Sequence, residues 1–235
     1  MNQFPVVLAS YFNHKNDPQR GFLWDSDYSK LLPLVHSVVS HGVPIKVFHN
    51  CFTSLPEIDN CEWIKTEADP ALTPNIARYF KYLIYLTENL DKFESVFMVD
   101  STDVEMLKNP FDHIKPGVLY VGDEIRSTVG SKWMQRTQGK YLDIPDYLQI
   151  ISKHRNEVLI NCGIIGGDIL TVIKFLEQLT EYHTRYSKNL TTSSDMSVFN
   201  YTMWKHFKNI MNRGPHVNTR FKREERNRVA WWKHK

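Results

Sequence analysis

The feature that most restricts the fold of this chain is an alternation of strand-like and helix-like segments near its start. Residues 5–12 (PVVLASYF) form a short apolar run with β-branched residues, which predicts a buried strand. Apolar residues then recur with helical spacing over 28–39, and Gly42 is placed to end that helix. Residues 44–49 (PIKVFH) predict a second strand. Two strands joined through a helix indicate a parallel pair in an α/β sheet.

The same alternation continues along the chain. A helix is expected over 75–89, followed by strands over 95–99, 118–121 and 157–160. Asp168 is placed to cap one further helix and Ser194 another, and residues 229–232 indicate a strand or an ordered strap. No linker or internal repeat divides the 235 residues. We therefore expect one α/β domain, residues 1–235, with a mostly parallel central sheet flanked by helices.

Composition narrows the class of protein. Hydrophobic residues make up 42% and charged residues 23% of the chain, which is ordinary for a soluble globular protein. No apolar run approaches the roughly 18 residues of a membrane helix, and the start lacks the pattern of a signal peptide. We expect a cytoplasmic chain without a transmembrane segment, or a soluble catalytic piece of a longer protein. Three cysteines without a CxxC pair argue against a disulfide framework and a zinc site.

Positive charge is concentrated at the end of the chain. Residues 213–235 hold eight Lys or Arg against two Glu, although the whole chain carries only +3. Such a basic segment is compatible with a solvated surface, with a nucleic-acid patch, or with a flap that closes over a phosphate-bearing ligand. The charge pattern alone leaves these three readings open.

Two carboxylates follow directly after the predicted strand 95–99. Asp100 and Asp103 are three residues apart, and carboxylate oxygens are the ligands that Mg²⁺ and Mn²⁺ prefer. Because ligands bind at the carboxyl ends of strands in open α/β sheets, we expect Phe12, Asp100–Asp103 and Asn161–Asp168 at one edge. Taken by itself, the pair is also compatible with a structure in which Asp100 caps a turn and the carboxylate of Asp103 lies in solvent. Three glycines within 161–168 permit close approach of a ligand, or a tightly packed turn.

The segment Asp100-Ser101-Thr102-Asp103-Val104, followed by Asn109-Pro110-Phe111, resembles the DxD region of GT-A-fold glycosyltransferases. It is most similar to the subgroup whose motif runs Asp-x-x-Asp-Val and soon reaches Asn/Asp-Pro-Phe. Four more stretches resemble the same family in the same order along the chain: the opening strand with its polar loop, Arg78-Tyr79-Phe80-Lys81, Asn161-Cys162-Gly163-Ile164-Ile165-Gly166-Gly167, and Val229-Ala230-Trp231-Trp232-Lys233-His234.

This resemblance implies a GT-A-like, Rossmann-like domain, with a nucleotide-binding part over about 1–105 and an acceptor-binding part over about 106–235. It implies a metal-dependent glycosyltransferase that moves a sugar from a UDP- or GDP-sugar to a glycan, glycoprotein or other hydroxyl acceptor. Mn²⁺ or Mg²⁺ is the implied cofactor, with Asp100, Asp103 and His234 as its ligands. A viral, bacterial or cytosolic glycan pathway would suit an enzyme without an anchor.

The remaining site expectations follow from the same comparison. Asp195, Asp123 and Asp168 are the candidate catalytic carboxylates, and His216 is a second candidate metal ligand. Asp123 and the adjacent Glu124 follow the predicted strand 118–121, where either could serve as an acceptor-side base or be solvated. Trp24, Trp133, Trp231 and Trp232 are expected either to stack on a sugar or uracil ring or to pack in the core. Removal of Trp231–Lys235 is expected to abolish activity and leave the fold intact. The expected donor-binding residues are Ser10, Tyr11, Phe12, Arg78, Lys81, Asp100, Ser101, Asn161, Gly166, Gly167 and Lys233.

Two other classes remain as alternatives. A sugar nucleotidyltransferase typically opens with a glycine-rich loop, whereas residues 5–20 contain no glycine. A non-catalytic module that binds nucleic acid or sugar is supported by the basic end of the chain, but the modest net charge and the Asp pair argue against it. We therefore expect no nucleic-acid partner.

Overall fold

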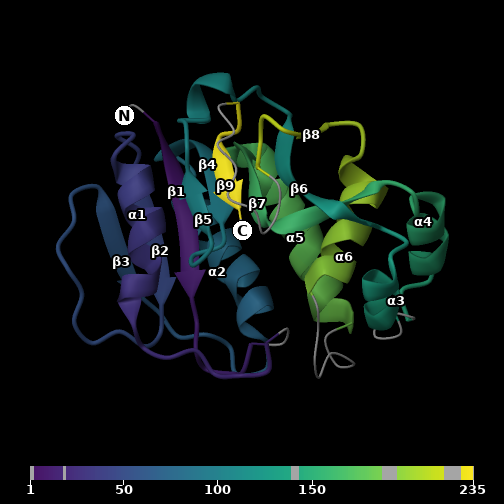
Figure 1. Ribbon diagram of the computed structural model, residues 1–235, viewed down its shortest axis with the longest axis horizontal. Helices are drawn as coiled ribbons and strands as arrows, with labels where there is room; N and C mark the ends of the chain where they lie inside the picture. Colours follow the sequence, from purple (N-terminus) through teal and green to yellow (C-terminus); the bar gives the residue numbers. More distant parts are fainter. Residues whose placement is uncertain (1–2, 18–19, 139–142, 187–194, 220–228, 235) are drawn as a thin grey trace.

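The computed structural model describes residues 3–17, 20–138, 143–186, 195–219 and 229–234. A seven-stranded sheet crosses the molecule in the order β3-β2-β1-β4-β7-β6-β8, and a small sheet pairs β5 with β9 (Figure 1). The strands are β1 (Phe4–Tyr11), β2 (Ile45–His49), β3 (Cys61–Lys65), β4 (Phe93–Val99), β5 (Val104–Met106), β6 (Leu119–Thr128), β7 (Val158–Asp168), β8 (Met211–Arg213) and β9 (Trp232–His234).

Helices cover both faces of the large sheet. Helices α2, α5 and α6 share one apolar core with the sheet, whereas α1, β5 and β9 share the core of the other face. The α-helices are α1 (Leu32–Val39), α2 (Pro74–Glu88), α3 (Lys132–Gln138), α4 (Tyr147–Lys153), α5 (Ile169–Tyr186) and α6 (Asp195–Thr202), with 3-10 turns at Tyr28–Leu31 and Phe111–His113 and a π-helical turn at Met203–Phe207.

The almost continuously apolar sequence of strand β1 is explained by its burial on both faces of the sheet. Val6 and Leu8 pack into the core on the α2 side, while Val7 and Ala9 pack into the core on the α1 side. All four side chains are fully buried. A strand covered on both faces has no polar side to alternate with, as expected in parallel α/β sheets.

The strand directions confirm the predicted α/β class with a mostly parallel sheet. Strands β3, β2, β1 and β4 pair in parallel, as do β6 and β8. Strand β7 is antiparallel to both of its neighbours, β4 and β6. The sheet is thus mixed, and its arrangement is compatible with a Rossmann-like fold.

The predicted helices lie close to the observed ones. Helix α2 spans Pro74–Glu88, against an expected 75–89. The helix expected over 28–39 begins as a 3-10 turn and becomes α-helical at Leu32. Pro33 sits in the first turn of α1, where its missing N–H is not needed. Gly42 follows α1 with φ +71°, as expected after a helix end.

The glycine-rich stretch after residue 160 was expected to be a turn, and this expectation is wrong. Strand β7 runs through it without interruption to Asp168. Gly166 lies against Phe97, and a Cβ atom there would meet the Phe97 ring at 2.4 Å. The glycine therefore makes room for a neighbouring ring inside the sheet, rather than for a bend in the chain.

Because β7 is antiparallel to β4, Asp168 pairs with Ser95 at the start of β4. The expectation that Asp168 shares an edge with Asp100 is therefore wrong. Its carboxylate instead accepts hydrogen bonds from Thr171 N at 3.0 Å and from Gly117 N at 2.7 Å. The first of these bonds confirms that Asp168 caps helix α5.

The end of the chain is part of the core. Strand β9 pairs antiparallel with β5, so that His234 lies opposite Val104. Trp232 is fully buried, with its ring centre 5.3 Å from that of Phe97. Trp231 is also buried, against Tyr120 and His113. These two tryptophans are core residues, and the expectation that residues 231–235 can be removed without harm to the fold is wrong.

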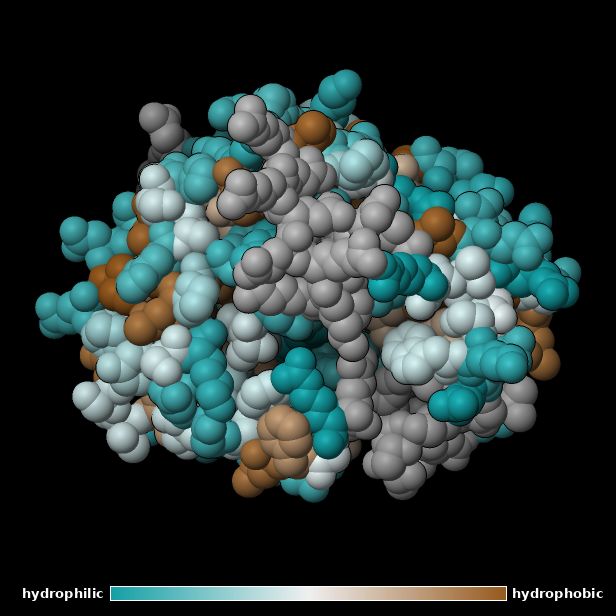
Figure 2. Space-filling view, viewed as in Figure 1, coloured by the Kyte–Doolittle hydropathy of each residue, from teal (hydrophilic) through white to brown (hydrophobic). Residues whose placement is uncertain are grey.

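Several expectations lie outside the described residues. They concern Ser194 and the basic side chains of Arg220, Lys222, Arg223, Arg226, Arg228 and Lys235. Among the helices that the structure describes, none has both the length and the apolar character to span a membrane. On the face shown in Figure 2, hydrophobic residues form only small groups between hydrophilic ones.

Candidate metal centre and pocket

A cavity of about 610 Å³ opens beyond the carboxyl ends of β1 and β4. Strand β1 contributes its last residues, and Asp100 follows β4 directly. Further lining residues come from α2, β6, β7, α3, α6 and β9. The lining residues are Ser10, Tyr11, Phe12, Asp17, Arg20, Trp24, Pro74, Asn75, Arg78, Asp100, Ser101, Thr102, Asp103, Glu124, Ser127, Trp133, Asn161, Cys162, Gly163, Asp195, Met196 and His234.

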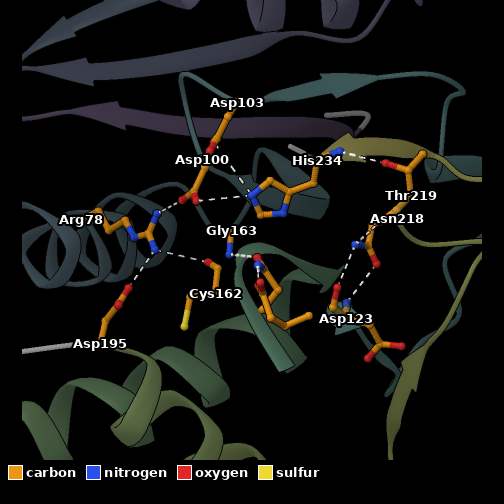
Figure 3. A network of polar contacts seen from close by, with 12 residues as sticks. Arg78, Asp100, Asp103, Asp123, Cys162, Gly163, Asp195, Asn218, Thr219 and His234 are labelled. Atoms are coloured by element: carbon orange, nitrogen blue, oxygen red, sulfur yellow. Dashed lines mark hydrogen bonds and ion pairs between the residues drawn. The ribbon is translucent and has the colours of Figure 1, made fainter. Parts of the chain in front are cut away.

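Asp100, Asp103 and His234 come together in this cavity (Figure 3). One ligand atom from each lies within 4.8 Å of the others. Nε2 of His234 is 3.9 Å from Oδ2 of Asp100 and 3.9 Å from Oδ1 of Asp103. The pairing of β5 with β9 explains the cluster, because it places His234 beside Val104, the residue after Asp103. The three residues expected to be metal ligands are thus brought together.

The protonation of these side chains suits a divalent cation. Burial, together with the nearby charge of Asp100, raises the pKa of Asp103 to about 7. Burial lowers the pKa of His234, so that its imidazole is neutral and has a lone pair to donate. Two adjacent carboxylates and a neutral imidazole form a set of ligand atoms that suits Mn²⁺, Mg²⁺ or a similar ion.

Arg78 links the candidate metal ligands to helix α6 (Figure 3). Its guanidinium donates hydrogen bonds to Oδ1 of Asp100, to Oδ2 of Asp195 at 3.0 Å and to the carbonyl oxygen of Cys162 at 3.3 Å. Burial acts to raise the pKa of Asp100, but Arg78 and His234 outweigh it, and the pKa is lowered. Arg78 lines the cavity as expected, but its donors are engaged with these two carboxylates.

Asp195, the first residue of α6, lies in the cavity wall with its side chain almost fully buried. Besides Arg78, the hydroxyl of Tyr79 donates to Asp195 Oδ2 at 3.3 Å. Burial raises the pKa of Asp195, and the charge of Arg78 opposes that shift. The expected position of this residue beside the pocket is therefore observed.

Strand β6 presents only one of its two adjacent candidate carboxylates to the cavity. Asp123 is not among the described residues that line the cavity; it forms an ion pair with Arg213 at 3.2 Å. Glu124 does line the cavity, and Asn161 Nδ2 donates to its Oε2 at 2.7 Å. Successive side chains of a strand point to opposite faces, so only one of the two carboxylates faces the cavity.

Four expected donor-binding residues do not line the cavity in the part of the chain that the structure describes. Lys81 lies on α2, three residues after Arg78. Lys233 points to the other side of β9 from His234 and pairs with Glu105 at 3.0 Å. Gly166 and Gly167 lie inside β7, opposite Phe97 and Val96. His216 is likewise outside the cavity, with Nε2 2.8 Å from Asn212 Oδ1.

The loop after β1 contributes residues that the sequence did not single out. Oδ2 of Asp17 accepts a hydrogen bond from Trp24 Nε1 at 3.1 Å. The guanidinium of Arg20 lies 4.8 Å from the centre of the Trp24 ring. A polar loop gives no periodic signal, so only the aromatic Trp24 was a candidate on sequence grounds. The glycine-rich stretch 161–168 was a candidate for ligand contact, and of its three glycines Gly163 lines the cavity, whereas Gly166 and Gly167 do not.

No protein-family model matches the chain, and no curated protein matches it significantly. Function must therefore be inferred from the pocket and its residues.

Proposed function

We propose that this chain is a metal-dependent glycosyltransferase that moves a sugar from a UDP- or GDP-sugar to a glycan, glycoprotein or other hydroxyl acceptor. The observation that carries the proposal is the meeting of Asp100, Asp103 and His234 in a pocket at the carboxyl ends of β1 and β4. Open α/β sheets bind nucleotides at this edge. The resemblance of residues 100–111 to the DxD region of GT-A-fold enzymes supports the same reading.

The charge of the pocket supports a role for a cation. Among the described lining residues, five carboxylates stand against two guanidinium groups: Asp17, Asp100, Asp103, Glu124 and Asp195 against Arg20 and Arg78. A diphosphate would be repelled by this excess of negative charge. A divalent ion on Asp100, Asp103 and His234 would offset two of these three excess negative charges at the place where the diphosphate has to bind.

Each part of the pocket then has a distinct task. When bound, the ion would neutralise the charge that grows on the diphosphate as the sugar leaves. Asp100, Asp103 and His234 would hold the ion, and Arg78 fixes the orientation of the Asp100 carboxylate. Ser10, Tyr11 and Phe12, at the end of β1, line the cavity and would border the nucleoside.

Isothermal titration calorimetry tests the proposal directly. UDP and GDP are titrated into the protein with Mn²⁺, with Mg²⁺ and with EDTA. We expect at least one nucleotide to bind far more tightly with metal than with EDTA. Asp103→Asn should abolish that difference, whereas Asp91→Asn, an exposed carboxylate in the turn before β4, should preserve it. Equal affinity with metal and with EDTA would contradict the proposal.

Product analysis separates the proposal from its alternatives. A glycosyltransferase releases UDP or GDP when the sugar is transferred. When no acceptor is present, many such enzymes transfer the sugar slowly to water and still release the nucleoside diphosphate. A sugar nucleotidyltransferase would release pyrophosphate from a nucleoside triphosphate and a sugar phosphate. A binding module would release neither product. We expect metal-dependent release of the nucleoside diphosphate and no pyrophosphate.

A further inference from the structure

Trp133 presents an unusually exposed indole ring to the pocket. Its side chain lies on helix α3, lines the cavity and is 39% exposed. By contrast, Trp204, Trp231 and Trp232 are 5%, 7% and 0% exposed. An exposed indole contributes little packing energy to the fold, so a flat apolar surface is available for a ligand.

The other tryptophan in the pocket is already engaged. Trp24 donates its Nε1 hydrogen to Asp17, and Arg20 lies over its ring. Within the part of the chain that the structure describes, no ring or cation covers Trp133. Of the two indoles, Trp133 is therefore the one with a face available for stacking.

Polar groups line the same cavity as the Trp133 ring. They include Glu124 and Ser127, in the second half of strand β6. The carboxylate of Glu124 accepts a hydrogen bond from Asn161 Nδ2 at 2.7 Å, and Asn161 Oδ1 in turn accepts from Gly163 N at 2.6 Å. The cavity thus contains both an apolar ring surface and a hydrogen-bond acceptor held in place.

We propose that Trp133 and Glu124 form a subsite for a neutral sugar ring of the acceptor. A pyranose ring has an apolar face of C–H groups, which can lie on the indole, and an edge of hydroxyl groups, which can donate to Glu124. The negative charge of Glu124 disfavours phosphate-bearing or carboxylate-bearing ligands near it. This inference rests on the proposed glycosyl transfer and names its acceptor as an uncharged saccharide.

The elements that carry the two sets of residues differ. Asp100 and Asp103 follow β4 and His234 ends β9, whereas Glu124 and Ser127 come from β6 and Trp133 from α3. All of them line one cavity, so an acceptor hydroxyl held by the second set would meet the donor sugar there.

Saturation-transfer NMR with defined glycosides tests the subsite. The probes are methyl β-D-glucopyranoside, methyl β-D-galactopyranoside, methyl α-D-mannopyranoside and the charged methyl β-D-glucopyranosiduronic acid. Each is titrated into the protein with and without UDP and Mn²⁺. Trp133→Ala, Trp133→Phe and Glu124→Gln are compared with the wild-type protein, and Leu170→Ala, an exposed apolar residue at the start of α5, is the control.

We expect at least one neutral glycoside to bind the wild-type protein and Leu170→Ala equally. Its affinity should fall about tenfold or more in Trp133→Ala, because the stacked apolar area is lost, and should partly return in Trp133→Phe. The glucuronide should bind more weakly than the glucoside, and Glu124→Gln should narrow that difference. Unchanged affinity in Trp133→Ala, or no binding of any neutral glycoside to the wild-type protein, would overturn the subsite.

The nucleotide measurements keep the two proposals apart. Binding of UDP or GDP with Mn²⁺ should be the same in Trp133→Ala and in the wild-type protein. Glycoside binding that depends on Trp133, without any nucleotide binding, would uphold the sugar subsite and overturn the glycosyltransferase. Metal-dependent nucleotide binding with glycoside binding that ignores Trp133 would overturn the subsite alone.

Discussion

Asp100, directly after β4, and Gly163, in the middle of β7, lie beside each other with no space for a side chain between them. A Cβ atom on Gly163 would lie 2.5 Å from Asp100 Oδ2, and 2.8 Å from Cε1 of His234. The backbones are joined as well, because Asp100 N donates to the carbonyl oxygen of Gly163 at 2.9 Å. The absence of a side chain at position 163 is what allows the two candidate ligands to approach each other.

Gly163→Ala should therefore weaken metal binding. The added methyl group must displace the Asp100 carboxylate or the His234 ring, and we expect a loss of about tenfold or more in Mn²⁺ affinity, or ~1.4 kcal/mol. Calorimetry or electron paramagnetic resonance of Mn²⁺ measures the change. Gly166→Ala is the matched control: its methyl group meets the Phe97 ring instead, so it should lower the melting temperature rather than the metal affinity per folded molecule.

The two carboxylates should differ in their effect on turnover. We expect Asp103→Asn to lower kcat by about 10²-fold or more, since an ion on the leaving diphosphate acts mainly in the transition state. Asp100→Asn should retain more turnover and raise KM, because the family resemblance implies that the first carboxylate of the motif lies nearer the ribose than the last one. Steady-state kinetics with the preferred donor measure both. Near-normal kcat in Asp103→Asn would reverse the two roles or remove the motif from the chemistry.

Metal binding should depend on pH around neutrality. Because the pKa of Asp103 is raised to about 7, the metal-free site holds a proton on Asp103 below that pH, and the ion must displace it. Burial lowers the pKa of His234, so its imidazole takes up a proton less readily than Asp103 does. We expect Mn²⁺ affinity to fall up to about tenfold per pH unit below 7 and to level off above it. A flat profile between pH 5.5 and pH 8 would contradict this assignment.

A buried histidine outside the pocket should make stability depend on pH. His183, on α5, is fully buried, and neither ring nitrogen has a hydrogen-bond partner among the described residues. Burial lowers its pKa from 6.5 to about 3. Between these two pH values His183 binds a proton in the unfolded chain but not in the folded chain. The neutral buried imidazole is therefore compatible with full stability above pH 6.5, and the unfolding free energy decreases as the pH falls from 6.5 towards 3.

Replacing His183 with leucine removes the imidazole that binds this proton in the unfolded chain. We expect the decrease in unfolding free energy between pH 8 and pH 5 to be smaller by about 2 kcal/mol in His183→Leu than in the wild-type protein. Urea unfolding at the two pH values measures the difference, and any constant effect of the new side chain on packing cancels. The same decrease in both proteins would mean that water or a proton reaches the imidazole in the folded state.

The end of the chain allows packing and metal binding to be separated. Trp232→Ala should cost about 3 to 5 kcal/mol of stability, because a fully buried indole leaves a cavity against Phe97. His234→Ala should instead remove metal binding at a smaller cost in stability. Thermal unfolding and Mn²⁺ titration of the two variants distinguish these effects. A stable Trp232→Ala protein would contradict the placement of β9 in the core.

Local sequence patterns were sufficient to predict those helices and strands whose structure is evident from their own residues. The apolar runs of β1, β2 and β4 and the apolar stripe of α2 are recognisable without any partner. The edge strands β3 and β8 were missed, since they are short and only partly buried. The length of β7 was missed because the role of Gly166 depends on Phe97, which lies far away in the sequence.

The pairing of strands also decides which of two neighbouring residues faces the cavity. Whether Asp123 or Glu124 faces the pocket is decided by the register of β6, which shifts between Val121 and Gly122. A bulge of this kind leaves no reliable mark in one sequence. The meeting of Asp100, Asp103 and His234 was expected from a family resemblance, and the geometry agrees; the ion itself stays a prediction.

The pairing of β9 with β5 ties the pocket to the folding of the entire molecule. Asp103 and His234 are separated by more than half of the chain and meet only when its last strand has docked. A partly folded chain therefore lacks the complete set of ligands. An ion and nucleotide bound there would stabilise only molecules that have finished folding. Occupancy of the site would then resist global unfolding rather than local fraying, and bound ligand could serve as a reporter of native protein during purification or refolding.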